Sequence, residues 1–307
     1  MSMLRNKDLL GIQQLSAEEI QLILDTAKTM KYILLQNSKK VPHLSGKSIT
    51  TLFFENSTRT RLSFELASKY MSAASANVAV ASSSVQKGES LLDTAVTIDQ
   101  MGTDILIVRH SMSGAPHLIA KHIKASVINA GDGVNEHPTQ ALLDALTMVE
   151  HKGKLEGLKV AIVGDIRHSR VARSNIFLLN KMGASVSVGG PSTLIPKYME
   201  QMNVSVFESV QEALLDADVV MGLRIQNERI SSNMFPSVRE YSRFFGIDQK
   251  RLEFAKPDAL LLHPGPVNRG VELSSGVVDS DQSLINEQVT NGVAVRMAVM
   301  YLLSRKG

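Results

Sequence analysis

A run of three hydroxyls and two guanidiniums, Ser57-Thr58-Arg59-Thr60-Arg61, is the part of the sequence best suited to bind an anion. It follows an apolar, β-prone run, and apolar side chains recur four residues apart after it, at Leu62, Leu66 and Tyr70. This spacing predicts a strand, a tight turn and a helix that buries those three side chains. Arginines are unfavourable at a helix N-terminus, because they add to its partial positive charge. A bound phosphate would neutralise this excess of positive charge. The pentapeptide alone fits equally well a Ser/Thr cap followed by surface arginines.

Length and composition are typical of a soluble globular protein with two domains. The chain has 307 residues, of which 44% are hydrophobic and 21% charged. A net charge of +3 argues against a dedicated nucleic-acid binder, while the isoelectric point near 9.0 fits a modest affinity for anions. The absence of cysteine excludes disulfides, thiolate nucleophiles and cysteine-based metal sites. Residues 1–7 lack the apolar core of a signal peptide, and we find no membrane-spanning run, so we expect a cytoplasmic protein.

Strand-like and helix-like segments alternate along the chain, and the alternation restarts after a charged, glycine-bearing segment at 151–154. The β-type runs lie at 48–54, 77–80, 104–108, 126–129, 158–165, 185–188, 204–207, 218–223 and 259–263. This order predicts an α/β protein with two doubly wound parallel-sheet domains. We expect residues 1–150 to form the first domain, residues 151–283 the second, and a C-terminal helix at about 284–307 to join the first domain.

The residues best suited to bind a ligand each follow a predicted strand. They are the 57–61 motif, Arg109, the segment 137–140, Arg170, Arg224 and the segment 264–266. Ligands of open parallel sheets bind beyond the carboxyl ends of the strands, so we expect the active site in the cleft between the domains. The sequence lacks a G-x-G-x-x-G fingerprint and a Walker motif, which favours a small phosphate ligand over a nucleotide.

Six sequence blocks identify a resemblance to a known family. They are Phe53–Arg61, Val85–Glu89, Gly131–Gly133 with His137–Gln140, Gly164–Asp165 with His168–Ser174, Leu223–Arg229, and His263–Gly270. In this order, and over almost the whole chain, they resemble the catalytic chains of aspartate carbamoyltransferases, within the aspartate/ornithine carbamoyltransferase superfamily. The alternative is an ornithine or other amino-acid carbamoyltransferase. Ornithine enzymes carry Cys-Leu-Pro where this chain has Pro264-Gly265-Pro266, and they need acidic groups where its second half offers arginines.

The resemblance implies roles for residues of the first half. Phosphate binding falls on Ser57, Thr58, Arg59 and Thr60, and Arg109 is expected to reach both the phosphate and the carbonyl oxygen of carbamoyl phosphate. His137 is expected to donate a hydrogen bond to that carbonyl oxygen, and Gln140 to bind the carbamoyl amide. The catalytic residues would then be Arg59, Thr60, Arg109 and His137. A structural role is the alternative for His137, and it is the interpretation we give to His110.

In the second half, the resemblance implies that Arg170 and Arg224 bind the two carboxylates of aspartate, with support from Gln226. Two planar guanidiniums suit a dicarboxylate better than two point charges do. The alternative is that both arginines form surface salt bridges. Gly265 and Pro266 are expected to contact the substrate through their backbone carbonyls, although many family members have a larger apolar residue at the position of Gly265.

The polar, aperiodic segment 82–90 predicts a loop. The resemblance implies that Ser83 and Lys87 on this loop enter the active site of a neighbouring subunit, in a homotrimer with shared sites. A solvated loop tip is the alternative. A regulatory or other pyrimidine-pathway chain is a further partner that the sequence leaves open.

The implied reaction transfers the carbamoyl group of carbamoyl phosphate to the amine of L-aspartate, the second step of de novo pyrimidine biosynthesis. It requires no cofactor, and the eight histidines show no spacing typical of a metal site. Two non-enzymatic alternatives are a dicarboxylate- or phosphate-binding protein and an inactive homologue with a scaffolding role. A binding protein would need neither Lys87 on a loop nor His137 at a carbonyl group. An inactive homologue would be expected to have lost some site residues, and none of the principal ones is missing here.

Overall fold

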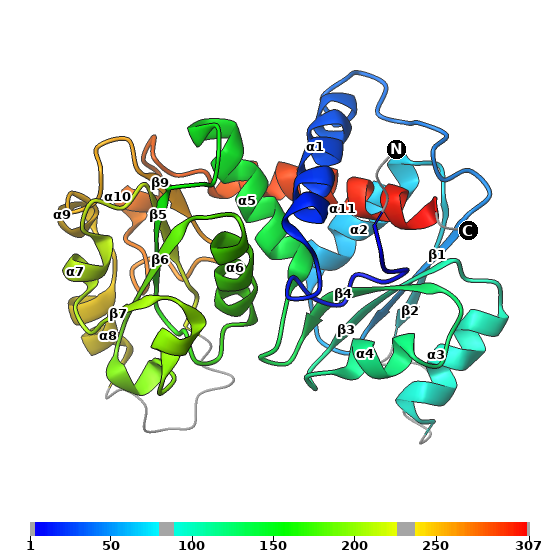
Figure 1. The fold of residues 1–307 in the computed structure, drawn as a ribbon, viewed down its shortest axis with the longest axis horizontal. Helices are drawn as coiled ribbons and strands as arrows, with labels where there is room; N and C mark the ends of the chain where they lie inside the picture. Colours follow the sequence, from blue (N-terminus) through cyan, green and yellow to red (C-terminus); the bar gives the residue numbers. More distant parts are fainter. Residues whose placement is uncertain (1–3, 80–88, 226–236, 306–307) are drawn as a thin grey trace. The chain divides into compact units, whose positions relative to one another are not determined.

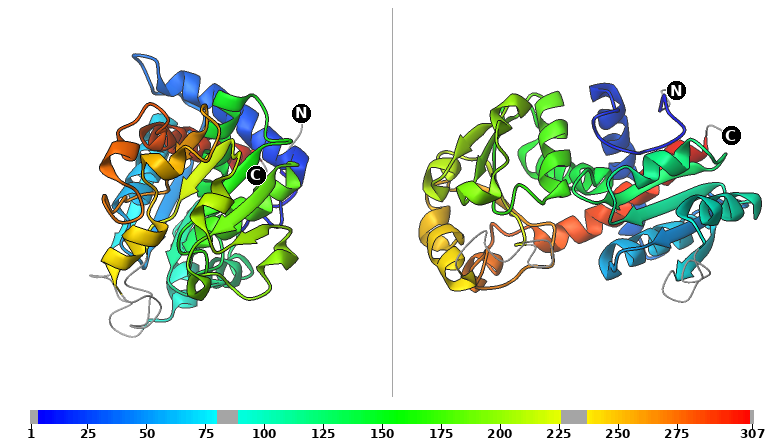
Figure 2. Two further views of the ribbon diagram at one scale, coloured as in Figure 1. Left: turned by 90° about the vertical axis from the view of Figure 1, so that its left-hand side faces the viewer. Right: turned by 90° about the horizontal axis from the view of Figure 1, so that it is seen from below.

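The computed structural model (Figure 1) describes residues 4–79, 89–225 and 237–305. The chain divides into two compact units, Met1–Leu146 with Thr290–Gly307, and Thr147–Val289. Each unit is built on a parallel sheet with helices on its faces, which confirms the predicted class of two parallel-sheet α/β domains. Both ends of the chain belong to the first unit (Figure 2).

The sheet of the first unit has the strand order β2-β1-β3-β4, and all neighbours are parallel. Its strands are β1 (Ser48–Phe53), β2 (Ala74–Ala79), β3 (Ile105–His110) and β4 (Ser126–Asp132). Helices α3 (Leu91–Gln100) and α4 (Ala115–Ala120) cover one face, where Leu106, Val108 and Val127 form a buried core with Ile98 and Ile119. The opposite face carries α1 (Ala17–Leu34), α2 (Thr58–Tyr70) and parts of α5 (Pro138–Lys152) and α11 (Ile285–Ser304).

The sheet of the second unit has the order β7-β6-β5-β8-β9, again entirely parallel. Its strands are β5 (Lys159–Val163), β6 (Ser185–Gly189), β7 (Ser205–Phe207), β8 (Val219–Gly222) and β9 (Leu260–Leu262). Its helices are α6 (Arg170–Lys181), α7 (Val210–Leu214), α8 (Val238–Phe245), α9 (Gln249–Leu252) and α10 (Ser275–Val278), with 3-10 turns at Ser192–Leu194 and Met199–Met202. Helices α6 and α7 lie on opposite faces of the sheet (Figure 1).

The buried face of α2 differs from the one that the sequence predicts. Leu62 is 49% exposed and Leu66 and Tyr70 are half-buried. The buried side chains are instead Thr60, Ser63, Phe64, Ala67 and Ser68. Arg296 of α11 explains the difference, because its guanidinium donates to the Ser63 hydroxyl at 2.9 Å and lies 5.0 Å from the centre of the Phe64 ring. The face of α2 that becomes buried is therefore the one that offers the Ser63 hydroxyl and the Phe64 ring to the buried Arg296 cation.

Buried carboxylates fix the turn between β4 and α5. Both oxygens of Asp132, which is fully buried, accept hydrogen bonds, from Gly114 N at 2.7 Å, Asn129 Nδ2 at 2.7 Å and Glu136 N at 3.1 Å. Glu136 in turn accepts from the backbone N–H of Ile12 at 2.7 Å. Hydrogen bonds from several backbone N–H groups compensate the burial of a carboxylate. The residue that follows this turn, His137, therefore starts from a well-anchored backbone.

His110 ends β3 as a buried, structural residue. Its ring centre lies 4.6 Å from that of Phe54, and its Nδ1 accepts a hydrogen bond from the Met112 N–H at 2.9 Å. Burial lowers the pKa of His110, and the carboxylates of Glu55 and Asp132 oppose this shift without reversing it. A neutral imidazole is needed for Nδ1 to accept, so the pKa shift and the hydrogen bond agree.

This arrangement predicts a pH-dependent contribution to stability. The folded chain holds His110 with a lowered pKa, so only the unfolded chain takes up the proton just below about pH 6.5. Folding stability from this group is therefore complete above about pH 6.5 and is lost as the pH falls through the folded-state value. His110→Asn keeps a short acceptor for the Met112 N–H but cannot titrate. Urea-unfolding midpoints at about pH 7.5 and about pH 5.5 should fall less for the variant than for the wild type; an equal fall in both proteins would contradict this role.

Candidate active site

Three segments meet at the carboxyl edge of the first sheet. The chain leaves β1 toward α2, passes the end of β3, and leaves β4 toward α5. Because β1, β3 and β4 are neighbours in the sheet, the 57–61 motif, Arg109 and the 137–140 segment lie at one edge. Backbone hydrogen bonds tie the strand ends together, from Phe54 N to Arg109 O and from Gly133 N to His110 O, each at 2.9 Å.

The N-terminus of α2 differs from those of the other helices that begin with an N-cap serine. Ser57 is the N-cap residue in an extended conformation, but its side chain makes no capping hydrogen bond, and the first turn contains no acidic residue. By contrast, the N-cap serines of α1, α3, α6 and α8 all accept a hydrogen bond from the helix backbone. Thr58 and Arg59 are exposed and Thr60 is buried. The helix start is therefore where the sequence predicts it, with hydroxyl and guanidinium groups in its first turn.

Arg109 extends from the last part of β3, where an ion pair and a hydrogen bond hold its side chain. Its Nε lies 3.2 Å from Glu55 Oε2, and one of its terminal nitrogens donates to the carbonyl oxygen of Ala130 at 3.2 Å. The side chains of Arg109 and Glu55 are only 14% and 18% exposed. These contacts fix the guanidinium plane at the sheet edge. The sequence analysis includes Glu55 in the block 53–61 but does not predict that it pairs with Arg109.

His137 and Gln140 stand at the start of α5. Both are nearly buried, and the Gln140 backbone N–H donates to the His137 carbonyl at 3.0 Å. The Gln140 side chain donates through Nε2 to Asp144 Oδ1 at 2.9 Å. Asp144, one helical turn later and fully buried, was also missed, although its spacing of four residues from Gln140 is the pattern of side-chain pairs on one helix face.

The predicted residues of the second unit lie at the carboxyl edge of its sheet, after the neighbouring strands β5, β8 and β9. Arg170 is the first residue of α6 and is 95% buried, while Arg224 follows β8 and is half-buried. Gly265 follows β9 with φ +64, a left-handed conformation that glycine adopts without the steric cost of a side chain, and its N–H donates to His263 Nδ1 at 2.8 Å. Pro266, next to it, is exposed.

Buried acids share this edge, and the sequence analysis did not identify them. Nδ1 of His168 lies 3.0 Å from Asp165 Oδ1, and Nε2 of His263 lies 3.3 Å from Glu272 Oε1. Burial raises the pKa of the Tyr241 hydroxyl, and the negative charges of Glu272 and Asp165 raise it further. The edge that carries the two arginines therefore also carries buried negative charge.

Several predicted site residues cannot be placed. Ser83, Lys87 and Gln226 lie outside the residues that the structure describes. In the described part of the chain, no group of three His, Asp or Glu side chains could hold a metal ion, and no helix is long and apolar enough to cross a membrane.

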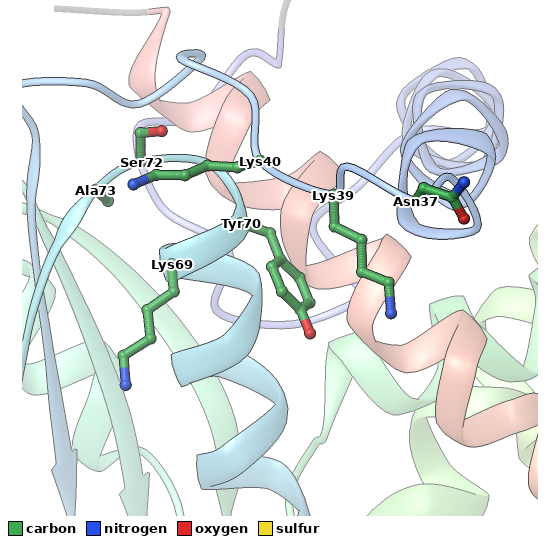
Figure 3. Close-up of a pocket in the computed structure, with 7 residues that line it drawn as sticks. All are labelled: Asn37, Lys39, Lys40, Lys69, Tyr70, Ser72 and Ala73. Atoms are coloured by element: carbon green, nitrogen blue, oxygen red, sulfur yellow. The ribbon is translucent and has the colours of Figure 1, made fainter.

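A pocket elsewhere in the first unit contains none of the predicted site residues. It is lined by Asn37, Lys39, Lys40, Lys69, Tyr70, Ser72 and Ala73 (Figure 3). It lies at the C-terminal end of α2, near the amino ends of the strands. The ammonium groups of its three lysines point in different directions, so they do not converge on one anion.

Comparison with known proteins matches both halves of the chain to one family. Residues 7–150 match the carbamoyl-P binding domain of aspartate/ornithine carbamoyltransferase, and residues 156–303 match the Asp/Orn binding domain of the same family. A protein of Acetivibrio thermocellus, named aspartate carbamoyltransferase catalytic subunit, is 71% identical over 99% of this chain and 97% of its own length.

Solved structures give the same result at lower identity. Aspartate transcarbamoylase from Trypanosoma cruzi, in complex with carbamoyl phosphate and aspartate, is 30% identical, with a TM-score of 0.88 over 97% of each chain. Ornithine carbamoyltransferase from Pyrococcus furiosus is 29% identical, with a TM-score of 0.87 over 98% of each chain. Two family matches that together span almost the whole chain, with a full-length relative at 71% identity, leave one conclusion: this chain belongs to the aspartate/ornithine carbamoyltransferase family.

Proposed function

We propose that this chain transfers the carbamoyl group of carbamoyl phosphate to the amino group of L-aspartate, giving N-carbamoyl-L-aspartate and phosphate. The observation that carries the proposal is the 71% identity, over 99% of the chain, to a protein named aspartate carbamoyltransferase catalytic subunit. Fold likeness alone does not choose the acceptor, because an ornithine enzyme matches with nearly the same TM-score as an aspartate enzyme. We assign this reaction to the second step of de novo pyrimidine biosynthesis.

The carboxyl edge of the first sheet supplies the proposed carbamoyl-phosphate site. Its phosphate ligands are Ser57, Thr58, Arg59, Thr60 and Arg109. The Ser57 hydroxyl caps no backbone N–H of its own helix, and the first turn of α2 has no acidic residue to compete with a phosphate. The partial positive charge of the helix N-terminus adds to the attraction. An anion here balances the positive charge that the helix start and its arginines bring together.

The chemistry follows from where charge develops. The deprotonated amine of aspartate attacks the carbonyl carbon, and negative charge builds up on the carbonyl oxygen as the tetrahedral intermediate forms. Arg109, His137 and Thr60 stabilise that oxygen by hydrogen bonding. The C–O bond to phosphate then breaks, and the leaving phosphate accepts the proton of the amine, so no protein general base is required. Much of the rate enhancement comes from holding two anionic substrates together.

The second unit supplies the proposed aspartate site. Arg170 and Arg224 bind the two carboxylates with bidentate geometry, and Gln226 supports them. The backbone carbonyls of Gly265 and Pro266 orient the reacting amine or the carbamoyl amide. The α6 position of Arg170 suits this role, because a buried guanidinium at a helix start is fixed in place.

We further propose a cytoplasmic homotrimer in which Ser83 and Lys87 of one subunit complete the site of its neighbour. Family resemblance supports this assembly. Ser83 would contact carbamoyl phosphate and Lys87 the aspartate.

A carbamoyl-transfer assay on the purified protein tests the reaction. With carbamoyl phosphate present, we expect carbamoyl-aspartate to form with L-aspartate and little product with L-ornithine, because arginines attract a dicarboxylate and repel the ornithine amine. Turnover with ornithine alone would overturn the roles of Arg170 and Arg224 and spare the phosphate site. No turnover with either acceptor would reject the proposed function and favour a non-catalytic homologue.

Arg109→Met should lower kcat by about 10²- to 10³-fold, because it removes a donor to the developing oxyanion. Lys47→Met is a matched control at the opposite edge of the same strands, where Lys47 Nζ lies 3.0 Å from Asp104 Oδ1. That control loses a similar ion pair but should keep full activity. Steady-state kinetics with both substrates varied would measure the effect, and equal losses in the two variants would show that ion pairing at the strand ends, rather than catalysis, is responsible.

A further inference from the structure

Helices α5 and α11 carry a buried cluster of three polar side chains next to the proposed carbamoyl site. They are Gln140, Asp144 and Arg296. We propose that Asp144 and Arg296 are positioning residues that turn the Gln140 amide so that its carbonyl oxygen accepts a hydrogen bond from the NH₂ of the carbamoyl group. This inference rests on the proposed function, in which the family resemblance assigns the carbamoyl amide to Gln140, and it adds the two residues that orient the Gln140 side chain.

The three side chains come from two helices of the first unit. Gln140 and Asp144 lie one turn apart on α5, and Arg296 lies on α11, which runs beside α5 and α2 (Figure 1). Asp144 is fully buried, and Gln140 and Arg296 are 8% and 4% exposed. Gln140 Nε2 donates to Asp144 Oδ1 at 2.9 Å. Arg296 is also fixed from the other side, by its hydrogen bond to Ser63 on α2.

Electrostatics link Arg296 to Asp144. Burial lowers the pKa of the Arg296 guanidinium to about 10, and the negative charge of Asp144 opposes this shift. Arg296 therefore remains a cation at neutral pH. A buried charge of either sign is costly without an opposite charge nearby, so each of these residues makes burial of the other tolerable.

The charge of Asp144 decides how the Gln140 amide is oriented. An ionised carboxylate only accepts hydrogen bonds, so the NH₂ of Gln140 must face it and the amide oxygen must point elsewhere. That oxygen is the group able to accept from a substrate NH₂. A neutral side chain at position 144 would not impose this orientation, because a protonated acid or an amide can also donate.

His137 and Gln140 together would then recognise the carbamoyl group specifically. His137 donates to the carbonyl oxygen, and Gln140 accepts from the NH₂ beside it. Acetyl phosphate has a methyl group in place of that NH₂ and cannot donate. The preference for carbamoyl phosphate over acetyl phosphate is therefore the quantity that the orientation of Gln140 should control.

The test compares Asp144→Asn, Arg296→Met and the double variant with the wild type. Dissociation constants would be measured for carbamoyl phosphate, acetyl phosphate and inorganic phosphate, together with urea-unfolding midpoints. We expect each single variant to lower the preference for carbamoyl over acetyl phosphate by about tenfold, the effect of one hydrogen bond with a buried partner. Binding of inorganic phosphate, which lacks the NH₂, should stay unchanged. Arg296→Lys, which keeps the cation, should restore most of the preference.

The double variant separates positioning from stability. Each single variant leaves one buried charge without its partner and should unfold at lower urea, whereas the double variant has neither charge and should recover stability. If the preference stays lost in the stable double variant, the positioning role holds. If the preference returns with stability, or never falls in the single variants, the role is wrong.

A control variant and the wild-type assay distinguish a failure of this inference from a failure of the proposed function. Ser68→Ala is the control for a change in the packing between α2 and α11. Like Ser63, Ser68 is a buried hydroxyl on the inner face of α2, but its hydrogen bonds go to Phe64 O and Met300 Sδ rather than to Arg296. It should leave the preference unchanged. Failure of the wild type to form carbamoyl-aspartate would reject the proposed function, whereas a normal wild type with unaltered preference in the variants would reject only the role of Asp144 and Arg296.

Discussion

Holding positive charge at the edge of a buried parallel sheet is the constraint on which the first unit depends. Parallel pairing of β1, β3 and β4 brings the start of α2, the Arg109 guanidinium and the turn before His137 to one edge. The Arg109 guanidinium at that edge is only 14% exposed and so loses most of its water, and it is repelled by neighbouring positive charge. Glu55 and the Ala130 carbonyl offset part of this cost at Arg109. Protein anions and dipoles therefore offset part of the positive charge at this edge, and a substrate phosphate would offset more of it.

The same principle organises the second sheet. Arg170 and Arg224 share its carboxyl edge with the buried carboxylates of Asp165 and Glu272. Each unit therefore brings arginines and carboxylates together. This agrees with the small net charge of +3, although the chain is proposed to bind two anionic substrates. Local attraction for anions is thus achieved by placement of arginines at strand ends rather than by an excess of positive charge over the whole chain.

The strands and the start of α2 could be predicted because their signals are local. Apolar runs mark buried parallel strands, and Ser57 ahead of a helical pattern marks an N-terminus. The buried face of α2 could not be predicted, since the partner of Ser63 is 233 residues away at Arg296. Charged residues on helices are normally exposed, so Asp144 and Arg296 read as surface positions until the packing of α11 against α2 and α5 is known. Long-range burial of polar groups leaves no periodic signal.

The buried pair of Asp144 and Arg296 connects these points. Two apolar residues of similar volume would fill the same space without desolvating charges, and such replacements are often neutral or stabilising. Packing alone therefore gives no reason for an arginine that is 96% buried between α2 and the Gln140–Asp144 pair. An ionised carboxylate does one thing that an apolar residue cannot, which is to fix the donor and acceptor ends of a neighbouring amide. The place where that matters is the residue whose amide faces the proposed carbamoyl group, so the cost of the buried charges is best understood as the cost of orienting Gln140.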